Sequence, residues 1–370
     1  MKINKLKYKK INNKKYFLAN QYSSDIQKLF KEINKEMVSK YALQLPNRDF
    51  IIKSLIQSIT QGDIERKQIT KSSFQIIRLD IKSFFPSINK HKLYRKISYS
   101  NLLSEDTIQI IKSITFNNYY EGVPIGLPFS SSLAEIALED FDNEIKNTVK
   151  PLFYFRFVDD IILFISPPNN KIDNINKIIE EIFDKHQFDF NEKRSLIKSG
   201  SKNWSFEYLG YSFSNVDGSL KIGIANKKLK KVKTKLHFYF RAFHKNNNFW
   251  LLYYRIKELI YSNTSYKDGE KFRYGFSHAY RFINNNEELN SIINLLVILL
   301  NQTNLSSRNK YLIFSLIPKD YNSLEKHKFN YTRISKKQLR IIANRLGIRI
   351  ITNNRKDQIN LITKEIYTFD

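Results

Sequence analysis

The chain has 370 residues, 42% of them hydrophobic, which suffices for two or three domains with a substantial core. Lys and Arg number 62 against 35 Asp and Glu, and the resulting net charge of +27 favours a polyanionic partner such as nucleic acid. A codon bias toward lysine is the alternative explanation, although it would leave the acids less outnumbered. The absence of cysteine excludes disulfides, thiolate zinc sites and a cysteine nucleophile.

The chain is predicted to be cytoplasmic. Its first 16 residues are rich in lysine and lack the apolar core of a secretory signal. The most apolar run, 292–300, is too short to cross a membrane and predicts a buried helix instead. We therefore expect no membrane partner.

Apolar periodicity predicts an α+β fold. Strand-like runs are rich in β-branched residues, whereas helical segments repeat their apolar residues every three or four positions. The predicted elements are helices within 23–59, a strand at 74–81, helices at 91–97, 106–115, 131–149 and 171–186, and hairpins at 152–165 and 206–224. The chain is then helical, basic and aromatic from about 226 to 320, and 334–367 predicts two or three short helices. This order suggests a mixed sheet with helices on one face, followed by a helical appendage.

Three aspartates interrupt apolar strands. Asp80 ends the strand at 74–81, and Asp159 and Asp160 lie between two apolar runs. Like charges this close to buried strands are unfavourable, and a bound cation removes that penalty. Magnesium prefers hard oxygen ligands of this kind. Taken alone, however, the adjacent pair is explained equally well by a polar hairpin turn.

The segments around these aspartates resemble the ordered palm motifs of reverse transcriptases. In chain order they read RLDIKSFFPSI, GVPIGLPFSSSLAEIAL, YFRFVDDIILF, FNEKRS and FEYLGYSF. The resemblance covers about residues 74–235. It implies a right-hand polymerase, in which fingers and palm form a mixed antiparallel sheet with helices and the thumb and C-terminal extension are α-helical. The domains it implies are N-terminal region and fingers 1–73, palm 74–225, thumb and extension 226–330, and a small helical unit 331–370.

The resemblance also implies a chemistry. Asp80, Asp159 and Asp160 match the catalytic carboxylates of the family, with Asp160 as the weaker participant. They would bind two Mg²⁺ ions, or Mn²⁺ in their place, with Ile81 beside Asp80 as a further ligand position. Two such ions activate the primer hydroxyl and stabilise the leaving pyrophosphate.

Phe85 matches the family position that faces the 2′ carbon of the incoming sugar. A bulky side chain there would clash with a 2′-hydroxyl and select deoxynucleotides, and this disfavours an RNA-templated RNA polymerase. An ordinary core phenylalanine is the alternative. Arg78, two residues before Asp80 on the same strand face, would contact the triphosphate. The remaining nucleotide-binding candidates are Arg48, Lys53, Gly126, Lys193 and Arg194.

These remaining candidates have ordinary alternatives. Arg48 and Lys53 belong to a segment resembling one in defence-type bacterial enzymes, but they would also suit surface salt bridges. Arg194, with Lys193 beside it, aligns with a family lysine thought to help protonate pyrophosphate. Arginine hardly gives up a proton, so a phosphate-neutralising cation or a solvated one is equally consistent.

A second set of residues is matched to the template and primer. Gly122, Pro124 and Gly126 resemble the loop beneath the templating base, where glycine permits close backbone approach. The family usually carries glutamine at the position of Ile125, so this chain lacks a hydrogen-bonding side chain there. The other template and primer candidates are Leu209 and Gly210 in a primer-gripping hairpin, and Lys227, Lys228 and Lys231 on a basic helix. A plain turn, a plain hairpin and a solvated helix face are the alternatives.

Among subfamilies, the bacterial abortive-infection and defence-associated enzymes match best. The chain has their PIG loop, their Arg-Asp segment at 48–49 and a helical extension. Group II intron enzymes are longer and usually read YADD where this chain has FVDD, and the retron segments resembling NAxxH and VTG are absent. The resemblance implies anti-phage defence with RNA, particularly a dedicated noncoding RNA, a DNA product and dNTPs as partners, and either self-association or a second defence protein.

Alternatives to this reading remain open. The same site would suit untemplated or protein-primed DNA synthesis, or a retron-type enzyme. A non-enzymatic RNA-binding scaffold is a further alternative, which the presence of all three aspartates disfavours. Finally, 335–362 resembles a SAP-like helix–extended–helix nucleic-acid-binding unit with a core of Leu339, Ile342, Leu346 and Ile348, although a plain terminal helical cap explains it equally well.

Overall fold

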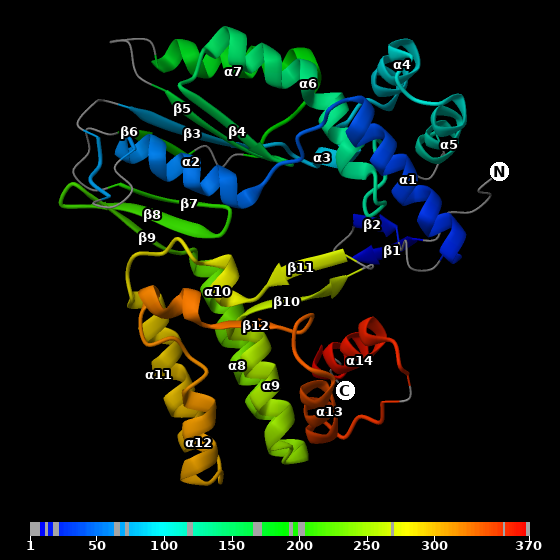
Figure 1. Cartoon of the computed structure of the whole chain (residues 1–370). Helices are drawn as coiled ribbons and strands as arrows, with labels where there is room; N and C mark the ends of the chain where they lie inside the picture. The colour runs from blue at the N-terminus through cyan, green and yellow to red at the C-terminus, as the bar shows by residue number, and fades with distance from the viewer. Residues whose placement is uncertain are drawn as a thin grey trace. The chain divides into compact units, whose positions relative to one another are not determined.

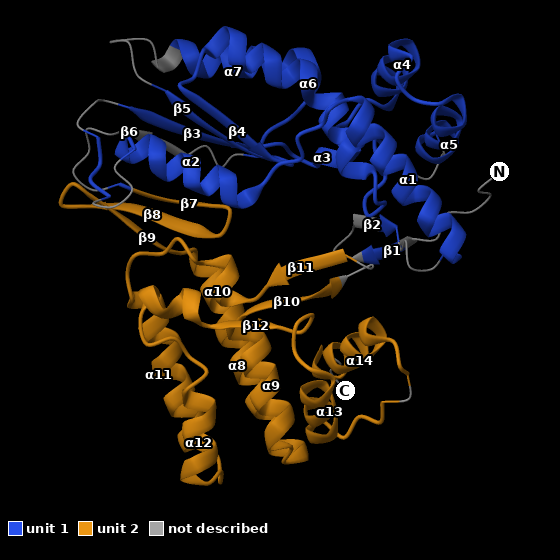
Figure 2. Cartoon of the chain, viewed as in Figure 1, with its two compact units in different colours: residues 1–204 blue, residues 205–370 orange. Residues whose placement is uncertain are grey.

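The computed structural model divides into two compact units, 1–204 and 205–370, which are described here in turn (Figures 1 and 2). The residues that the structure describes are 8–11, 14–17, 22–62, 67–70, 74–116, 121–165, 172–191, 195–198, 204–267, 270–350 and 352–367. Within these residues, no helix combines the length and the apolar character needed to cross a membrane.

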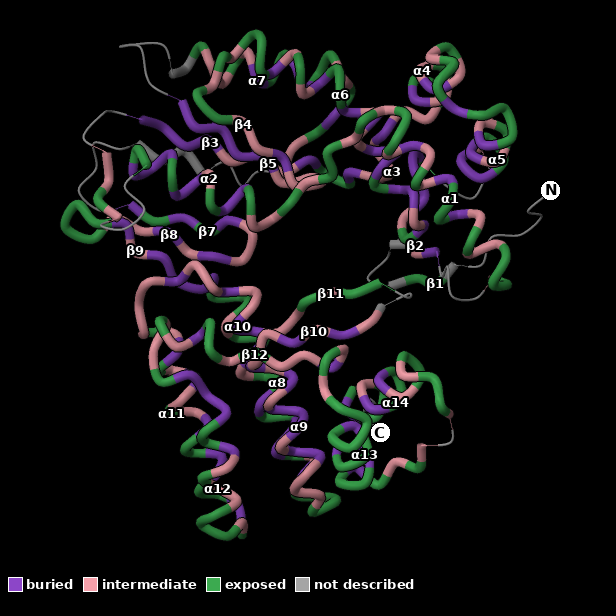
Figure 3. Tube along the Cα trace, viewed as in Figure 1, coloured by how far each residue is buried: buried purple, intermediate pink, exposed green. Residues whose placement is uncertain are grey.

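Unit 1 is built on a four-stranded antiparallel sheet with the order β4-β5-β3-β6. Its strands are β3 (Gln75–Asp80), β4 (Phe153–Phe157), β5 (Asp160–Ile165) and β6 (Ser195–Lys198). The predicted strand at 74–81 and the predicted hairpin at 152–165 are therefore confirmed. β3 and β5 are neighbours at the centre, and their apolar residues are almost wholly buried (Figure 3).

Helices surround this sheet. They are α1 (Ser24–Lys40), α2 (Arg48–Thr60), α3 (Phe84–Ser87), α4 (Lys90–Ser100), α5 (Glu105–Thr115), α6 (Ser130–Val149) and α7 (Ile172–His186). Several begin at a side chain that caps their free N–H groups, such as Asn47 before α2 and Asn89 before α4. A short hairpin of β1 (Tyr8–Ile11) and β2 (Lys14–Phe17) precedes them.

Strand alternation assigns the two faces of the sheet. Ile77 and Leu79 of β3 share a hydrophobic core with Ile161 and Leu163 of β5 and with residues of α1, α6 and α7. Because successive side chains in a strand point to opposite faces, the even-numbered residues of β3 and β5 face away from that core. This alternation places Arg78, Asp80 and Asp160 together on the opposite face.

Unit 2 begins with the antiparallel meander β7 (Ser205–Tyr208), β8 (Tyr211–Val216) and β9 (Ser219–Ile224). Its helices are α8 (Asn226–Asn246), α9 (Phe249–Ile260), α10 (Phe276–Ala279), α11 (Glu287–Asn301), α12 (Ser307–Phe314), α13 (Lys336–Arg345) and α14 (Arg355–Tyr367). The apolar run 292–300 lies in α11, and four of its nine residues are buried, which places one face of this helix in the core. The α+β class and the mainly helical second half are thus confirmed.

Unit 2 also contains a sheet that the sequence did not predict. β10 (Ser262–Lys267) pairs antiparallel with β11 (Glu270–Tyr274) and parallel with β12 (Lys328–Asn330). The inward residues of β10 are polar: Asn263 and Ser265 are almost fully buried, and the Asn263 amide donates to the carbonyls of Glu258 and Tyr261. A strand with a polar buried face gives no alternation of apolar residues, so periodicity missed it.

The C-terminal segment contains two short helices, α13 and α14, as predicted for 334–367, and its resemblance to a SAP-like unit stays a prediction. Leu339, Ile342 and Leu346 are buried and Ile348 is partly buried, as the predicted core requires. The same hydrophobic cluster includes Leu251 and other residues of α9, so α13 and α14 pack onto the rest of unit 2.

Candidate active site

The strand register brings two of the three aspartates together. Asp80 closes β3 and Asp160 opens β5, and they are direct partners across the antiparallel pair. Such partners have Cβ atoms only about 5 Å apart. The two carboxylates therefore share one end of the central strands, on the face opposite the α6–α7 core.

The third aspartate lies in the tight turn between β4 and β5. Val158, immediately before Asp159, has φ of 62°, a left-handed conformation that is costly for a β-branched residue. The turn is held on both sides: the Val158 carbonyl accepts from Nη1 of Arg156 at 3.1 Å, and the Asp159 carbonyl accepts from Ile81 N at 3.0 Å. Backbone strain sustained by surrounding bonds is typical of functional sites.

Arg78 forms a bidentate ion pair with Asp160. Its Nε donates to Oδ1 at 2.9 Å and its Nη2 donates to Oδ2 at 2.8 Å. Burial raises the pKa of Asp160, the Arg78 guanidinium opposes this rise, and the negative charge of Asp80 adds to it. The structure thus places Arg78, predicted to contact the triphosphate, against a carboxylate of the same site. One arginine does not neutralise both facing acids.

Asn191 is a site residue that the sequence analysis did not single out. Its Nδ2 donates to Oδ1 of Asp80 at 2.6 Å, and its backbone N donates to the Asp80 carbonyl at 2.9 Å. The adjacent Phe190 bridges to Ile81, and Lys82 N donates to the Asp189 carbonyl at 2.8 Å, so both residues after β3 are tied to the segment 189–191. Asn191 belongs to the quoted FNEKRS motif, which was the available signal. Lys193 and Arg194 of that motif lie outside the described residues.

The donor types suit a hard divalent cation. Asp80 and Asp160 offer carboxylate oxygens at one strand end, the ligands that Mg²⁺ prefers. Within the described part of the chain, no three acidic or histidine side chains already form a metal-binding group. The bond between Arg78 and Asp160 occupies one of these carboxylates.

Phe85 lies in the short helix α3, half-buried, with its ring 5.0 Å from that of Phe84 in a T-shaped arrangement. The loop carrying Gly122 packs directly on its backbone, because Val123 N donates to the Phe85 carbonyl at 2.8 Å. A Cβ on Gly122 would lie 2.2 Å from the Phe85 oxygen and 2.5 Å from the Pro86 oxygen. The structure therefore brings the predicted sugar-facing residue and the predicted template loop together.

The other side of this loop contacts the N-terminal hairpin. Phe17 N donates to the Ile125 carbonyl at 2.7 Å. Gly126 has φ of 98°, and a Cβ there would lie 2.6 Å from the Phe17 oxygen. Pro124 is buried, and its carbonyl accepts from the Ser130 hydroxyl at the start of α6. The glycines are thus required by close packing against the protein's own backbone, and a contact of this loop with a base pair stays a prediction.

Arg48 and Lys53 lie on α2 of the same unit. Arg48 is the first residue of the helix and is half-buried, whereas Lys53 is exposed. Their predicted contact with nucleotide stays a prediction.

The predicted primer hairpin and basic helix adjoin each other in unit 2. Leu209 and Gly210 form the tip between β7 and β8 with φ of 46° and 86°, the two positive values of a type I′ hairpin turn. Glu207 accepts from Asn226 N at 2.8 Å, which ties the hairpin to the start of α8. Lys227, Lys228 and Lys231 are exposed on that helix.

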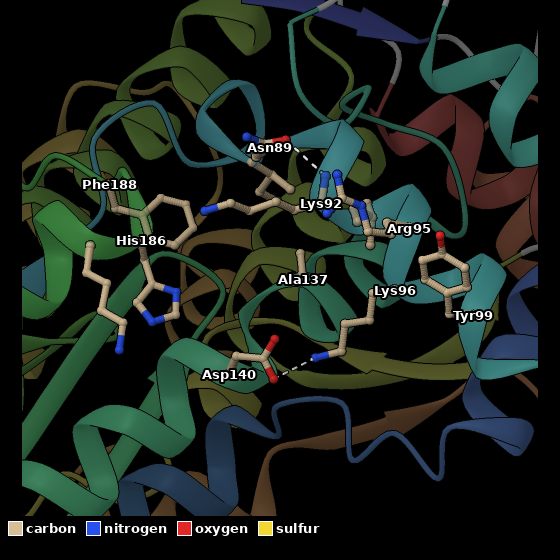
Figure 4. A pocket seen from close by; sticks show the side chains of 12 residues that line it. Asn89, Lys92, Arg95, Lys96, Tyr99, Ala137, Asp140, His186 and Phe188 are labelled. Atoms are coloured by element: carbon tan, nitrogen blue, oxygen red, sulfur yellow. Dashed lines mark hydrogen bonds and ion pairs between the residues drawn. The ribbon is translucent and has the colours of Figure 1, made fainter.

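A separate pocket of unit 1 lies between α4, α6 and the end of α7 (Figure 4). It has a volume of about 440 Å³ and an apolar floor that includes Leu93 and Phe188. Lys96 within it pairs with Asp140 at 3.0 Å and with Glu139 at 2.8 Å. None of the residues that line it is a predicted site residue, so it is distinct from the carboxylate site.

Residues 8–213, more than half of the chain, match the family described as reverse transcriptase (RNA-dependent DNA polymerase). Retron Ec86 reverse transcriptase of Escherichia coli is 25% identical over 170 residues, which are 45% of this chain and 49% of that protein. The chain thus matches about half the length of this relative.

Solved structures of telomerase are also similar to the chain. The structure from Candida albicans in complex with a fragment of telomeric RNA shows 13% identity and a TM-score of 0.42, over 92% of this chain and 54% of that one. Apo telomerase from Candida tropicalis shows 12% identity and a TM-score of 0.43, over 92% and 60%. These values are low, and no residue role is transferred from them. By its match over residues 8–213, the chain belongs to the reverse transcriptase family.

Proposed function

We propose that the protein is an RNA-directed DNA polymerase that extends a primer with dNTPs at the carboxylates of Asp80, Asp159 and Asp160. The observation that carries the proposal is the register of β3 and β5, which pairs Asp80 with Asp160 beside the strained turn that carries Asp159. Divalent ions, two Mg²⁺ in this proposal, would supply activation of the primer hydroxyl and stabilisation of the leaving pyrophosphate.

The protein's own residues would prepare this site. Arg78 holds the Asp160 carboxylate in a fixed orientation, and Asn191 does the same for Asp80. Phe85 and the Gly122 loop, packed backbone to backbone, would form the wall that excludes a 2′-hydroxyl and supports the new base pair. In unit 2, the hairpin tip at Leu209 and Gly210 would hold the primer end. The exposed lysines of α8 would follow the phosphate backbone.

The test is nucleotide incorporation by the purified protein with its copurifying RNA, offered the four dNTPs or the four rNTPs with Mg²⁺. We expect dNTP incorporation that Asp159→Asn abolishes, and Phe85→Ala should admit rNTPs. Omission of single dNTPs tests for a template, because only templated synthesis stops at defined positions. Absence of incorporation under every condition, with RNA binding retained in both proteins, would contradict the proposal and favour an RNA-binding scaffold.

We further propose that the enzyme acts in anti-phage defence with a dedicated noncoding RNA as template. The supporting features are the PIG loop, the Arg-Asp segment at 48–49 and the helical extension. The similarity to retron Ec86 reverse transcriptase favours a retron-type enzyme as the second candidate. Sequencing the copurifying RNA and the DNA product tests the template. A single RNA species complementary to the DNA supports it, whereas DNA with no complementary RNA favours untemplated or protein-primed synthesis.

A further inference from the structure

An open pocket in unit 2 lies between the β10–β11 hairpin and α14, and we call it the β10–α14 pocket. Its volume is about 450 Å³, which is within the range typical of small-molecule sites, roughly 300–1,000 Å³. Four aromatic side chains line it, namely Tyr266, Phe272, Tyr274 and Tyr367. All four remain partly exposed, so their rings are accessible from solvent.

The aromatic walls are held in place. Phe272 and Tyr274 lie two residues apart on the same face of β11, and their rings are stacked at 4.9 Å with an interplanar angle of 21°. The Tyr367 hydroxyl donates to Oε2 of Glu258 at 3.3 Å, and the electrostatic influence of the same carboxylate extends to Tyr274. Glu258 is itself only 2% exposed. The Tyr367 side chain is therefore oriented by a buried acid behind it, and little order would have to be gained there on binding.

The rim of the pocket is polar and positively charged. Asn360 and Lys364 lie on the exposed side of α14 and line the pocket. Lys356 lies one helical turn before Asn360, and its ammonium is 5.4 Å from the centre of the Tyr266 ring. The Thr363 hydroxyl donates to the Ile359 carbonyl at 3.0 Å, which leaves its oxygen able to accept a bond. The rim thus offers an amide, a hydroxyl acceptor and cations around flat aromatic surfaces.

This combination narrows the class of ligand. Aromatic walls suit either a flat base or a quaternary ammonium group. A cationic ligand would meet Lys356 and Lys364 at the rim, and Lys356 already lies over Tyr266. A nucleotide instead places a base on the aromatic rings and a phosphate beside the lysines. The chain's net charge of +27 favours the same choice.

We propose that the β10–α14 pocket binds one unpaired base of a single-stranded nucleic acid, with an adjoining phosphate at Lys356 and Lys364. The proposal rests on the proposed function only in taking nucleic acid as the partner. Because α14 is the last helix of the 335–362 segment that resembles a SAP-like unit, the pocket would fix the nucleic acid at a point distinct from the carboxylates of unit 1.

The test is the affinity of the full-length protein for unstructured oligonucleotides of identical sequence in RNA and in DNA, without dNTPs. Phe272→Ala should weaken binding roughly tenfold, because loss of one stacked base weakens binding roughly 5- to 150-fold. The matched control is Tyr311→Ala, which removes an aromatic ring that is 70% exposed on α12 outside the pocket. The preference between the RNA and DNA oligonucleotides identifies the natural strand.

Three further measurements separate stacking from charge and from misfolding. Lys364 is exposed on α14, and Lys364→Ala should reduce the slope of log affinity against log salt by about 0.7, the value for one single-stranded phosphate. An oligonucleotide with abasic sugars should bind the wild type and Phe272→Ala equally. A 4-thiouridine oligonucleotide should crosslink to the peptide containing Tyr266 and Phe272 in the wild-type protein.

The outcomes distinguish this proposal from the proposed function. Wild-type binding that is unaffected by Phe272→Ala and by Lys364→Ala would overturn the pocket proposal alone. If tetramethylammonium occupied the pocket in preference to the oligonucleotide, the pocket proposal would be overturned in favour of a site for cations. Failure of the wild type to bind any oligonucleotide would overturn both proposals. Loss of polymerisation in Asp159→Asn with unchanged binding would leave the pocket proposal supported.

Discussion

Two strands of the unit 1 sheet each carry an arginine that faces acidic side chains. The two clusters differ in the hydrogen bonds that the arginine donates and in its exposure to solvent. On β4, Arg156 donates from Nε, Nη1 and Nη2 to Glu135 and Asp142 of α6 and to the Val158 carbonyl. Tyr154 adds a bond to Asp142. On β3, Arg78 donates from Nε and Nη2 to the two carboxylate oxygens of Asp160.

Exposure separates the clusters further. The Arg156 side chain is 4% exposed, whereas that of Arg78 is 30% exposed. The buried carboxylates raise the pKa of Arg156 far above its ordinary value, since removal of its proton would leave them unpaired. At the other cluster burial raises the pKa of Asp160, the Arg78 guanidinium opposes this rise, and repulsion from the Asp80 carboxylate adds to it. The buried Arg156 cluster anchors the hairpin, whereas the Arg78–Asp160 cluster on the same sheet is partly open to solvent.

The largest effect on stability is expected at the Arg156 cluster. Arg156→Ala would leave Glu135 and Asp142 buried without their partner, and loss of one member of a buried ion pair costs about 3–5 kcal/mol. The free energy of unfolding from urea titration measures this loss. Lys96→Ala is the matched control, because its partners Glu139 and Asp140 are more than half exposed and such pairs contribute about 1 kcal/mol or less. Equal losses in the two variants would contradict the distinction.

At the carboxylates of Asp80 and Asp160, a substitution should reduce activity without reducing the free energy of unfolding. Asp80→Asn relieves repulsion with Asp160 and keeps an oxygen that accepts from Asn191, so the free energy of unfolding should not decrease. dNTP incorporation should fall roughly 1,000-fold or more, since several kcal/mol of charge stabilisation is lost. Asp142→Asn is the comparison: it should destabilise the fold. A fully active Asp80→Asn protein would contradict the assignment of the carboxylates.

A smaller effect is expected at the loop that packs on Phe85. Gly122→Ala should destabilise unit 1 and impair incorporation, because its Cβ would lie 2.2 Å from a backbone oxygen and its φ is 62°. Gly218→Ala, with φ of 81° and nothing within 4 Å, carries only the conformational penalty of about 1–2 kcal/mol. The difference in unfolding free energy between the two variants measures the packing of the loop. No difference would show that the Phe85 turn yields to the added methyl group.

The sequence predicted those parts of the fold whose burial is apolar and periodic. β3 and β5 were identified because continuous apolar runs form a strand buried on both faces, and Asp80, Asp159 and Asp160 were conspicuous as charges at the ends of these runs. The β10–β12 sheet was missed because Asn263 and Ser265 occupy its buried positions.

Long-range pairing was the other feature that the sequence could not provide. Arg78 is 82 residues from Asp160, and Asn191 is 111 residues from Asp80. Nothing in the local sequence of any of these residues specifies its partner. The partners follow only from the register of the folded strands, so the resemblance located the acids but not the groups that orient them.

The smallest effect is expected at a third site, the buried carboxylate of Glu258 in unit 2. Glu258 is paired with tyrosine hydroxyls instead of an arginine. Tyr331 and Tyr367 donate to it, but burial is the stronger influence and raises its pKa above the ordinary value of 4.5. The folded protein therefore holds this proton to a higher pH than the unfolded chain does. The contribution of Glu258 to stability is full below its unfolded-state pKa and is lost as pH rises through the folded-state pKa.

Glu258→Gln removes this ionisation while keeping the shape of the side chain. The unfolding free energy of the wild type relative to Glu258→Gln should decrease from acidic to neutral pH, and Glu365→Gln on the exposed side of α14 is the control for the substitution. A difference that stays constant with pH would contradict the raised pKa. If the difference instead increased with pH, the tyrosine hydroxyls would stabilise the carboxylate as effectively as Arg156 stabilises Asp142.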